Sequence, residues 1–301
     1  MADKRKQKIL ETALSRFQLM QEANEEINRV ALEDMRFIKG EQWPDDILNA
    51  RKQDNRPSLV INKLHTAVRQ IVNDQKQNRP AIEVNPVDDY ADVDTAEVLQ
   101  GLIRNIENVS DAEYAYDTAF EGACRCGRGF FRLYTDYVSD DSFEQELRIG
   151  VIDNPFKAGI DPYSIMLDGS DAKWGFVWDT MTKEEFEAEY GKKALEMHSD
   201  WETIGEDHKG WAGPDELRVA EYYYKDFERV KLIQLSGGEN YFEDELPEQN
   251  EDGSYSFTYE MMDPTTGEMI EVIEDETIID ERWSKRCKVK HCKLTAVDVL
   301  E

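Results

Sequence analysis

Apolar residues recur at about every third or fourth position through the first forty residues of the chain. Between Lys6 and Ile38 this spacing predicts one long amphipathic helix with a single apolar stripe. The expected stripe consists of Leu10, Leu14, Phe17, Met20, Ile27, Val30, Met35 and Ile38. The fold is therefore expected to begin with a long helix.

Residues that favour turns follow this helix. Gly40 suits the left-handed conformation that ends many helices, so the helix is expected to stop near Lys39. Trp43 and Pro44 predict a turn that opens a short helix from Asp45, because proline fits the first turn of a helix. We expect Trp43 to anchor this turn against the core.

Two Arg-Pro steps enclose the next helix. They are Arg56-Pro57 and Arg79-Pro80. Between them, residues 59–61 are expected to be extended, and Asn62 to cap a helix that runs to about residue 78. Residues 81–84 alternate apolar and polar side chains and are expected to form a strand. For each arginine, a clamp on a carboxylate or carbonyl group of another subunit and a salt bridge within the chain both remain open.

Helical periodicity continues up to residue 124 and then gives way to alternation. Two helices are expected over residues 92–108 and 111–124, with Ser110 or Asp111 as the cap of the second. Beyond Gly127, alternating patterns predict strands. The expected strands cover residues 131–137, 143–152, 174–180, 217–225 and 228–235.

Local signals divide this second part further. Thr182 and Glu185 form the capping-box pattern of a short helix that reaches Tyr190. Turn signals at residues 236–238, 252–253 and 263–267 mark residues 239–281 as a hairpin arm.

These elements predict an α+β fold in which long amphipathic helices precede a β-rich, wing-like region with hairpins. We expect a mainly helical region over residues 1–126 and a β-rich region over residues 127–301. The arm of residues 239–281 is expected to be an exposed insertion, and a contact with another subunit or a tail factor remains open for it.

Charge is distributed very unevenly over these regions. The chain has 65 acidic and 36 basic residues, a formal charge of −29, yet the part up to Pro80 has 15 basic and 12 acidic residues. The arm holds 16 acidic residues and no Lys or Arg, whereas residues 282–293 hold six basic residues and no acid. One face of the strand expected there carries Arg286, Lys288 and Lys290, and the other carries Trp283, Cys287 and Val289. We expect this basic stripe to pair with carboxylates of the arm or of a neighbouring subunit.

The acidic balance argues against one class of function. Proteins that coat nucleic acid neutralise phosphates with Lys and Arg, and this chain as a whole would repel the polymer. The sequence also lacks a signal-peptide pattern and an apolar run long enough to cross a bilayer. We therefore expect neither a membrane protein nor one secreted by a signal peptide.

No recognised catalytic motif is present. The sequence has no phosphate-binding loop, and Cys124, Cys126, Cys287 and Cys292 lack the spacing of a zinc site. No histidine lies in a recognised nucleophile context. We expect no catalytic residue, cofactor or metal, and a nucleotide-dependent enzyme is kept only as a third hypothesis without a residue to support it.

Three runs of sequence form a distinctive pattern: a G-x-Q-W turn, an Arg-Pro step before an apolar run and Asn, and a second Arg-Pro step opening a segment that ends at Pro. The runs are residues 40–44, 56–64 and 78–86. They resemble the N-terminal region of bacteriophage portal proteins, especially those of short-tailed phages. Residues 160–174, 181–190 and 218–225 resemble later parts of that region, so the likeness covers about residues 36–235 and, more weakly, the last strand.

The resemblance implies a portal-like fold and a structural role. Portal proteins form a twelve-subunit ring at one capsid vertex, a conduit through which a terminase motor drives DNA in and through which DNA later leaves. It also implies capsid and scaffolding proteins, tail or head-completion proteins and passing double-stranded DNA as partners, in a virion assembled in the host cytoplasm. Candidate structural or subunit-interface residues are Trp43, Pro44, Arg56, Pro57, Asn62, Arg79, Pro80, Arg286, Lys288 and Lys290.

An alternative function is open at this point. An acidic α+β head-completion or adaptor protein would use the same helices and arm for protein contacts alone, without a DNA conduit. Portal family members are also far longer than this chain, so tunnel-lining and clip regions are expected beyond residue 301.

Overall fold

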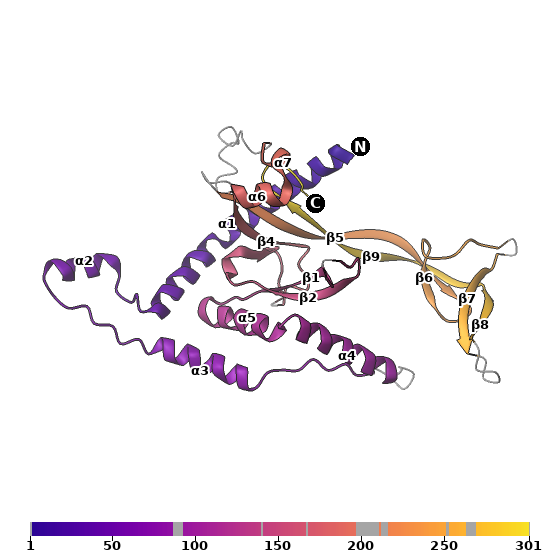
Figure 1. Cartoon of the computed structure of the whole chain (residues 1–301), viewed down its shortest axis with the longest axis horizontal. Coiled ribbons are helices and arrows are strands. Elements are labelled where there is room, and N and C mark those ends of the chain that lie inside the picture. The colour runs from indigo at the N-terminus through magenta and orange to yellow at the C-terminus, as the bar shows by residue number, and fades with distance from the viewer. Residues whose placement is uncertain are drawn as a thin grey trace. The chain divides into compact units, whose positions relative to one another are not determined.

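The computed structural model describes residues 2–86, 93–139, 141–166, 168–196, 211, 216–250, 253–262 and 269–300 (Figure 1). Its helices are α1 (Ala2–Lys39), α2 (Asp45–Gln53), α3 (Leu64–Gln77), α4 (Val93–Val109), α5 (Ala112–Cys126), α6 (Lys183–Tyr190) and α7 (Lys192–Glu196), with a 3₁₀ turn at Pro155–Lys157. Its strands are β1 (Phe131–Tyr137), β2 (Gln145–Val151), β3 (Ala158–Ile160), β4 (Trp174–Thr182), β5 (Glu216–Leu235), β6 (Asn240–Phe242), β7 (Tyr255–Met262), β8 (Met269–Glu276) and β9 (Ile278–Leu294). The predicted α+β class is confirmed.

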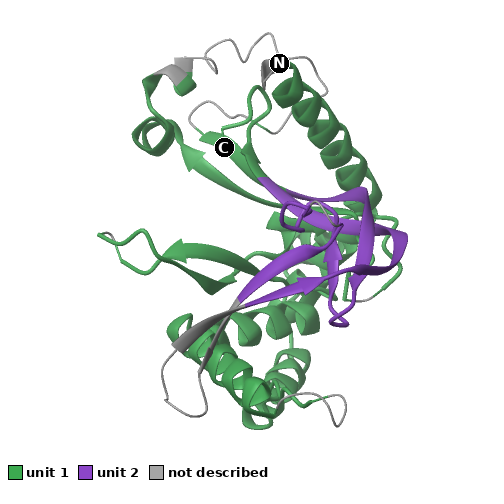
Figure 2. Cartoon of the chain, turned by 90° about the vertical axis from the view of Figure 1, so that its right-hand side faces the viewer, with its two compact units in different colours: residues 1–222, 292–301 green, residues 223–291 purple. Residues whose placement is uncertain are grey.

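The chain divides into two compact units (Figure 2). Unit 1 consists of residues 1–222 and 292–301, and unit 2 of residues 223–291. This division falls elsewhere than the expected change of region at residue 126, although the last residue of α5 is Cys126 and β1 begins soon after it. The long strands β5 and β9 pair with each other and contribute residues to both units.

Every strand pair whose register is known is antiparallel. β1 and β2 form a hairpin in which Phe131 lies opposite Val151, and β3 pairs with β4. β4 neighbours β5, whose end pairs with β6. β7 and β8 form a separate two-stranded ribbon. The turn predicted at residues 263–267 lies outside the described residues, but the two strands that flank it pair as a hairpin would.

An aromatic cluster forms the centre of unit 1. Phe17 of α1 is 2 % exposed, and its ring makes edge contacts with Phe176 and Trp178 of β4. Phe176 in turn stacks on Tyr222, with ring centroids 4.7 Å apart. The first half of α1 is thus fixed on the sheet by rings that bury large apolar areas.

Close approach of α1 to the sheet requires a glycine on β3. A Cβ atom at Gly159 would lie 2.4 Å from the sulfur of Met20, a distance at which one of the two must move. Met20 itself is 1 % exposed, so it has little space to yield.

The far end of α1 packs in a second cluster. Ile38 contacts Val68 and Val72 of α3, and Phe120 and Cys124 of α5 pack against these three. The predicted end of the helix is also confirmed, because Gly40 has φ +106° and its N–H donates to the carbonyl oxygen of Phe37.

The predicted apolar stripe of α1 was wrong in its middle part. Ile27 and Val30 are 54 % and 42 % exposed, whereas Ala31 is buried and Asn28 accepts a hydrogen bond from the Arg128 guanidinium. The contact side of α1 therefore passes through polar Asn28 between its two apolar ends. Apolar spacing alone could not locate this stretch, since its contact is polar.

Two strand predictions also differ from the structure. Residues 217–225 and 228–235 belong to the single strand β5. Residues 81–84 form no strand; instead the Gln100 side chain of α4 donates to the carbonyl oxygen of Ile82 and accepts from the N–H of Val84, both at 2.7 Å. A side-chain amide takes the place of a neighbouring strand.

Helix caps agree only in part with the sequence signals. Thr182 and Glu185 form the predicted capping box of α6. Asp111 stands at the N-cap of α5 without a side-chain bond, and Ser110 accepts a hydrogen bond from the backbone N–H of Ile149 instead. The hydroxyl that was expected to cap α5 thus ties α5 to β2.

The aromatic cluster supports a first prediction. Phe17→Ala removes a buried ring and leaves a cavity, so we expect a loss of about 3–5 kcal/mol in the free energy of unfolding. Phe37→Ala on the same helix, at a side chain 46 % exposed, should change it by less than about 0.5 kcal/mol. Urea unfolding of both variants measures the difference, and equal losses would contradict the assigned core.

Candidate functional site

The sequence-predicted candidate residues occupy three separate places: the loop around α2, the end of α3, and strand β9. Within the part of the chain that the structure describes, no three His, Cys, Asp or Glu side chains are grouped to hold a metal ion. No described helix is long and apolar enough to span a membrane. The candidate sites are therefore surfaces and ion-pair networks.

Trp43 orders the loop around α2 without entering the core. It is half-buried, its indole N–H donates to the carbonyl oxygen of Leu59 at 3.2 Å, and the guanidinium of Arg51 lies 4.7 Å from its ring centre. Arg51 also donates to the carbonyl oxygen of Pro57 at 2.6 Å. The expected anchor against the core was wrong because α2 has no buried residue, and Trp43 instead fixes the first Arg-Pro step.

Arg56 and Asn62 make local contacts on either side of that step. Arg56 pairs with Asp54 at 3.7 Å, and both side chains are more than 60 % exposed. Asn62 donates from its amide to the carbonyl oxygen of Ile38 and accepts from the backbone N–H of His65. Asn62 therefore joins the start of α3 to the end of α1, while Arg56 contributes little to stability.

Arg79 lies in a denser network at the other end of α3. Its guanidinium donates to Asp117 of α5 at 2.8 Å and also to Glu113, and Lys76 pairs with the same Asp117 carboxylate at 3.6 Å. The Asp117 side chain is only 12 % exposed. A carboxylate with so little access to water destabilises the fold unless cations pair with it. Arg79 therefore links the end of α3 to α5.

A groove opens beside this network. Its volume is about 760 Å³, and it lies between the end of α3, the following segment 80–82, α4, α5 and the start of β1. Apolar walls are supplied by Pro80, Ile82, Tyr116 and Phe131. The charged lining consists of Glu107, Asp111, Glu113, Asp117, Arg79 and Arg104. Carboxylates thus outnumber guanidiniums four to two.

Two buried oxygens in this groove have no donor. Asp117 Oδ1 and Gln75 Oε1 are shielded from solvent, and neither accepts a hydrogen bond from any residue that the structure describes. Burying an acceptor without a donor costs about 1–3 kcal/mol, so these two oxygens reduce the stability that the contact between α3 and α5 provides.

An apolar segment lies exposed at the opposite end of α3. Leu59 and Ile61 are 79 % and 81 % exposed, whereas Val60 between them is 38 % exposed. This alternation directs Leu59 and Ile61 to one side. Sequence patterning marked these residues as apolar, but it could not show that no residue described in the structure covers them.

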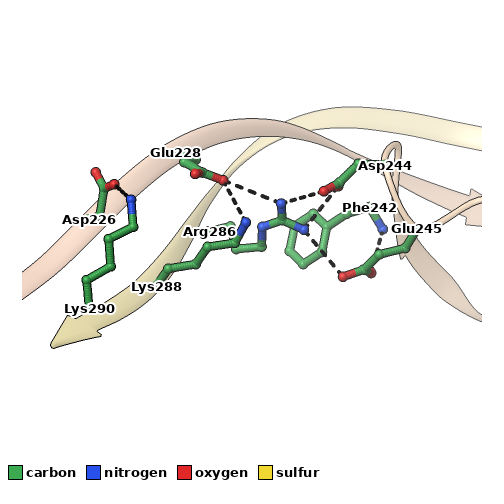
Figure 3. A network of polar contacts seen from close by, with 8 residues as sticks. All are labelled: Asp226, Glu228, Phe242, Asp244, Glu245, Arg286, Lys288 and Lys290. Atoms are coloured by element: carbon green, nitrogen blue, oxygen red, sulfur yellow. Dashed lines mark hydrogen bonds and ion pairs between the residues drawn. The ribbon is translucent and has the colours of Figure 1, made fainter. Parts of the chain in front are cut away.

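Strand β9 carries the third candidate set (Figure 3). Arg286 donates to Asp244 at 2.6 and 3.0 Å, and to Glu245 at 3.3 Å. It also reaches Glu228 of β5 at 3.4 Å, and its guanidinium lies 5.0 Å from the ring centre of Phe242. The Arg286 side chain is only 14 % exposed, so this cation is enclosed within unit 2.

The two neighbouring lysines of the stripe face β5. Lys288 pairs with Glu228 at 3.1 Å, and Lys290 with Asp226. The hydrogen bond and charge of Lys288, joined by those of Arg286, hold the pKa of Glu228 below its ordinary value. The Arg286 hydrogen bond likewise lowers the pKa of Asp244. The arm supplies Asp244 and Glu245, but β5 supplies the other carboxylates, a contribution the charge pattern did not reveal.

The opposite side of β9 is the more exposed one. Trp283 and Val289 are 55 % and 66 % exposed, and Cys287 is also exposed. Arg229 and Lys231 lie over the Trp283 ring at 4.9 and 6.0 Å from its centre. The charged face of β9 is therefore its inner face within unit 2.

Comparison with known proteins identifies the family of this chain. Residues 14–301 match the model of the phage P22-like portal protein family. The chain belongs to that family. It is also similar to a "Portal protein" of Acyrthosiphon pisum secondary endosymbiont phage 1, with 27 % identity over 280 residues, 90 % of this chain.

The chain spans 36 % of the length of that curated relative. The portal protein family is structural, which agrees with the absence of a recognised catalytic motif from the sequence. The predicted portal and bacteriophage assignment is confirmed, and the candidate residues above are those of a portal component.

The Arg79 network supports a prediction about this portal chain. Arg79→Ala leaves the nearly buried Asp117 carboxylate with Lys76 alone, so we expect a loss of about 1–3 kcal/mol in unfolding free energy. Arg56→Ala is the matched control at the other Arg-Pro step and should cost less than about 0.5 kcal/mol, since its ion pair is exposed. Urea unfolding compares the two, and equal effects would refute the clamp.

The β9 network supports a prediction with a pH dependence. Because the folded pKa values of Asp244 and Glu228 are lowered, their stabilisation is complete above the ordinary values of 3.8 and 4.5 and is lost as pH falls through the folded ones. Arg286→Gln should therefore accelerate amide hydrogen exchange in β9 at neutral pH, and the difference from the unsubstituted protein should shrink below about pH 4.

Lys285→Gln removes one positive charge from an exposed position of the same strand and serves as the control. Exchange measured by mass spectrometry should be nearly the same in this variant as in the unsubstituted protein. A difference for Arg286→Gln that persists undiminished at low pH would count against ion pairing as its cause.

Proposed function

We propose that this chain is part of a subunit that assembles into a ring, with twelve copies, at one vertex of a phage capsid. The ring is a conduit for DNA during packaging and ejection, and it offers docking surfaces to the terminase motor, to capsid and scaffolding proteins, and to tail or head-completion proteins. The observation that carries this proposal is the family match over residues 14–301, nearly the whole chain.

Charge supports the conduit role. A wall that binds DNA tightly would hold it, whereas an acidic surface releases no counterions from the phosphates and so grips them weakly. The formal charge of −29 gives this region little attraction for DNA, and the basic stripe of β9 is engaged by carboxylates of its own unit. Passage of DNA through the ring therefore needs no tight contact with this region.

The tunnel-lining and motor-binding parts are proposed to lie outside these residues. The chain spans 36 % of its curated relative, so we assign to it the helical region and the β-rich wing rather than the whole conduit. Assembly of the particle is proposed to take place in the host cytoplasm.

Electron microscopy of the assembled full-length protein tests the proposal. We expect closed rings with an axial opening wide enough for duplex DNA, and native mass spectrometry should give twelve copies. In filter binding, duplex DNA should be retained weakly, with little dependence on salt concentration.

Two outcomes would redirect the assignment. A stable monomer, or a closed small oligomer without an opening, would favour a head-completion or adaptor protein instead. Tight, strongly salt-dependent DNA binding would contradict the weakly gripping wall.

A further inference from the structure

We infer that the segment 56–63 of one copy inserts into the groove beside Arg79 of the next copy, so that α3 links each subunit to two different neighbours. The inference rests on the proposed ring and specifies the surfaces that meet in it. The segment supplies exposed apolar side chains and cations, and the groove supplies apolar walls and an excess of carboxylates.

The two surfaces are complementary in polarity, and the groove is large enough for the apolar side chains of the segment. The groove volume of about 760 Å³ lies in the range of clefts that enclose drug-sized ligands, so it has room for the side chains of Leu59 and Ile61. Pro80, Ile82 and Phe131 are apolar walls for these two. The segment is already ordered by Arg51 and Trp43, which hold the carbonyl oxygens of Pro57 and Leu59, so its insertion has a reduced entropic cost.

Charge decides between this segment and another exposed apolar loop. Ile165 is 91 % exposed and Tyr163 is 75 % exposed, in a loop held by Asp161 and Asp171. That loop brings carboxylates, which the acidic groove would repel. The segment 56–63 instead begins with Arg56 and ends with Lys63, two cations opposite in sign to the net charge of the groove lining.

The segment cannot fill the groove of its own chain. The chain enters α3 from the segment at one end and leaves it toward residues 80–82 at the other (Figure 1). The 14 residues of α3 span about 21 Å, and Asn62 and Arg79 fix its two ends to α1 and α5. A projection and its recess at opposite ends of one rigid helix produce a heterologous contact, which closes into a ring when the rotation per subunit allows it.

Disulfide cross-linking tests the contact in the assembled full-length protein. In a Cys287→Ser background, Ile61→Cys and Ile82→Cys together should give a ladder of covalent oligomers on mild oxidation. A mixture of the two single variants should stop at covalent dimers, and either single variant alone should give no oligomer. An intrachain bond is excluded because cysteine Cα atoms must approach to about 7 Å.

A second variant measures the strength of the contact. Leu59→Asp should raise the protein concentration needed for half-assembly by about tenfold or more, as the loss of a well-packed anchor does. Its thermal midpoint as a monomer should be unchanged, since Leu59 is exposed there. Ile273→Asp, at a side chain 66 % exposed in unit 2, is the control and should leave assembly unchanged.

The outcomes separate this contact from the ring itself. Rings that form without the Ile61–Ile82 ladder, or that tolerate Leu59→Asp as they tolerate the control, would overturn the contact and leave the proposed function intact. An unsubstituted full-length protein that stays monomeric would overturn the proposed function, and the contact with it.

Discussion

The attachment of α3 to α5 by Arg79 is the contact on which the groove in unit 1 depends. Asp117 is nearly buried, and a carboxylate in that position is tolerated only while cations face it. Arg79 and Lys76 both come from the end of α3 or directly after it, so the ion pairs fix the position of that helix end. Because that helix end is fixed, so is the groove beside Arg79, and residues 80–82 are placed where the Gln100 side chain can donate to the carbonyl oxygen of Ile82.

A polar contact also joins the two packed ends of α1. Phe17 lies in the aromatic cluster with β4, and Ile38 lies in the cluster with α3 and α5. Between them, Asn28 accepts a hydrogen bond from Arg128, which follows α5 directly. A single helix thus connects the sheet of unit 1 to the helices that carry the groove. The sequence predicts the length of α1, and in the structure that length lets one helix reach both clusters.

How far the sequence could be interpreted depended on the kind of contact. Amphipathic helices, the capping box of α6 and the glycine that ends α1 leave local patterns, and these were predicted correctly. The strand at residues 81–84 was wrong because alternation says only that a segment is extended, whereas its partner is the side chain of Gln100, far away in sequence. The prediction that Trp43 packs against the core was wrong. A large apolar side chain favours a core position, but the adjacent helix α2 has no buried residue.

The ion pairs of the β9 cations change how the net charge of the chain is interpreted. From the sequence alone, Arg286, Lys288 and Lys290 formed a stripe that could have faced a polyanion. In unit 2 each of them meets a carboxylate, and Arg286 is nearly enclosed by three. Cations neutralised in this way release no counterions from DNA, so they add little to any attraction for it. Carboxylates outnumber cations in residues 223–291, so the charge asymmetry first seen along the chain becomes a physical reason for weak attraction between unit 2 and DNA.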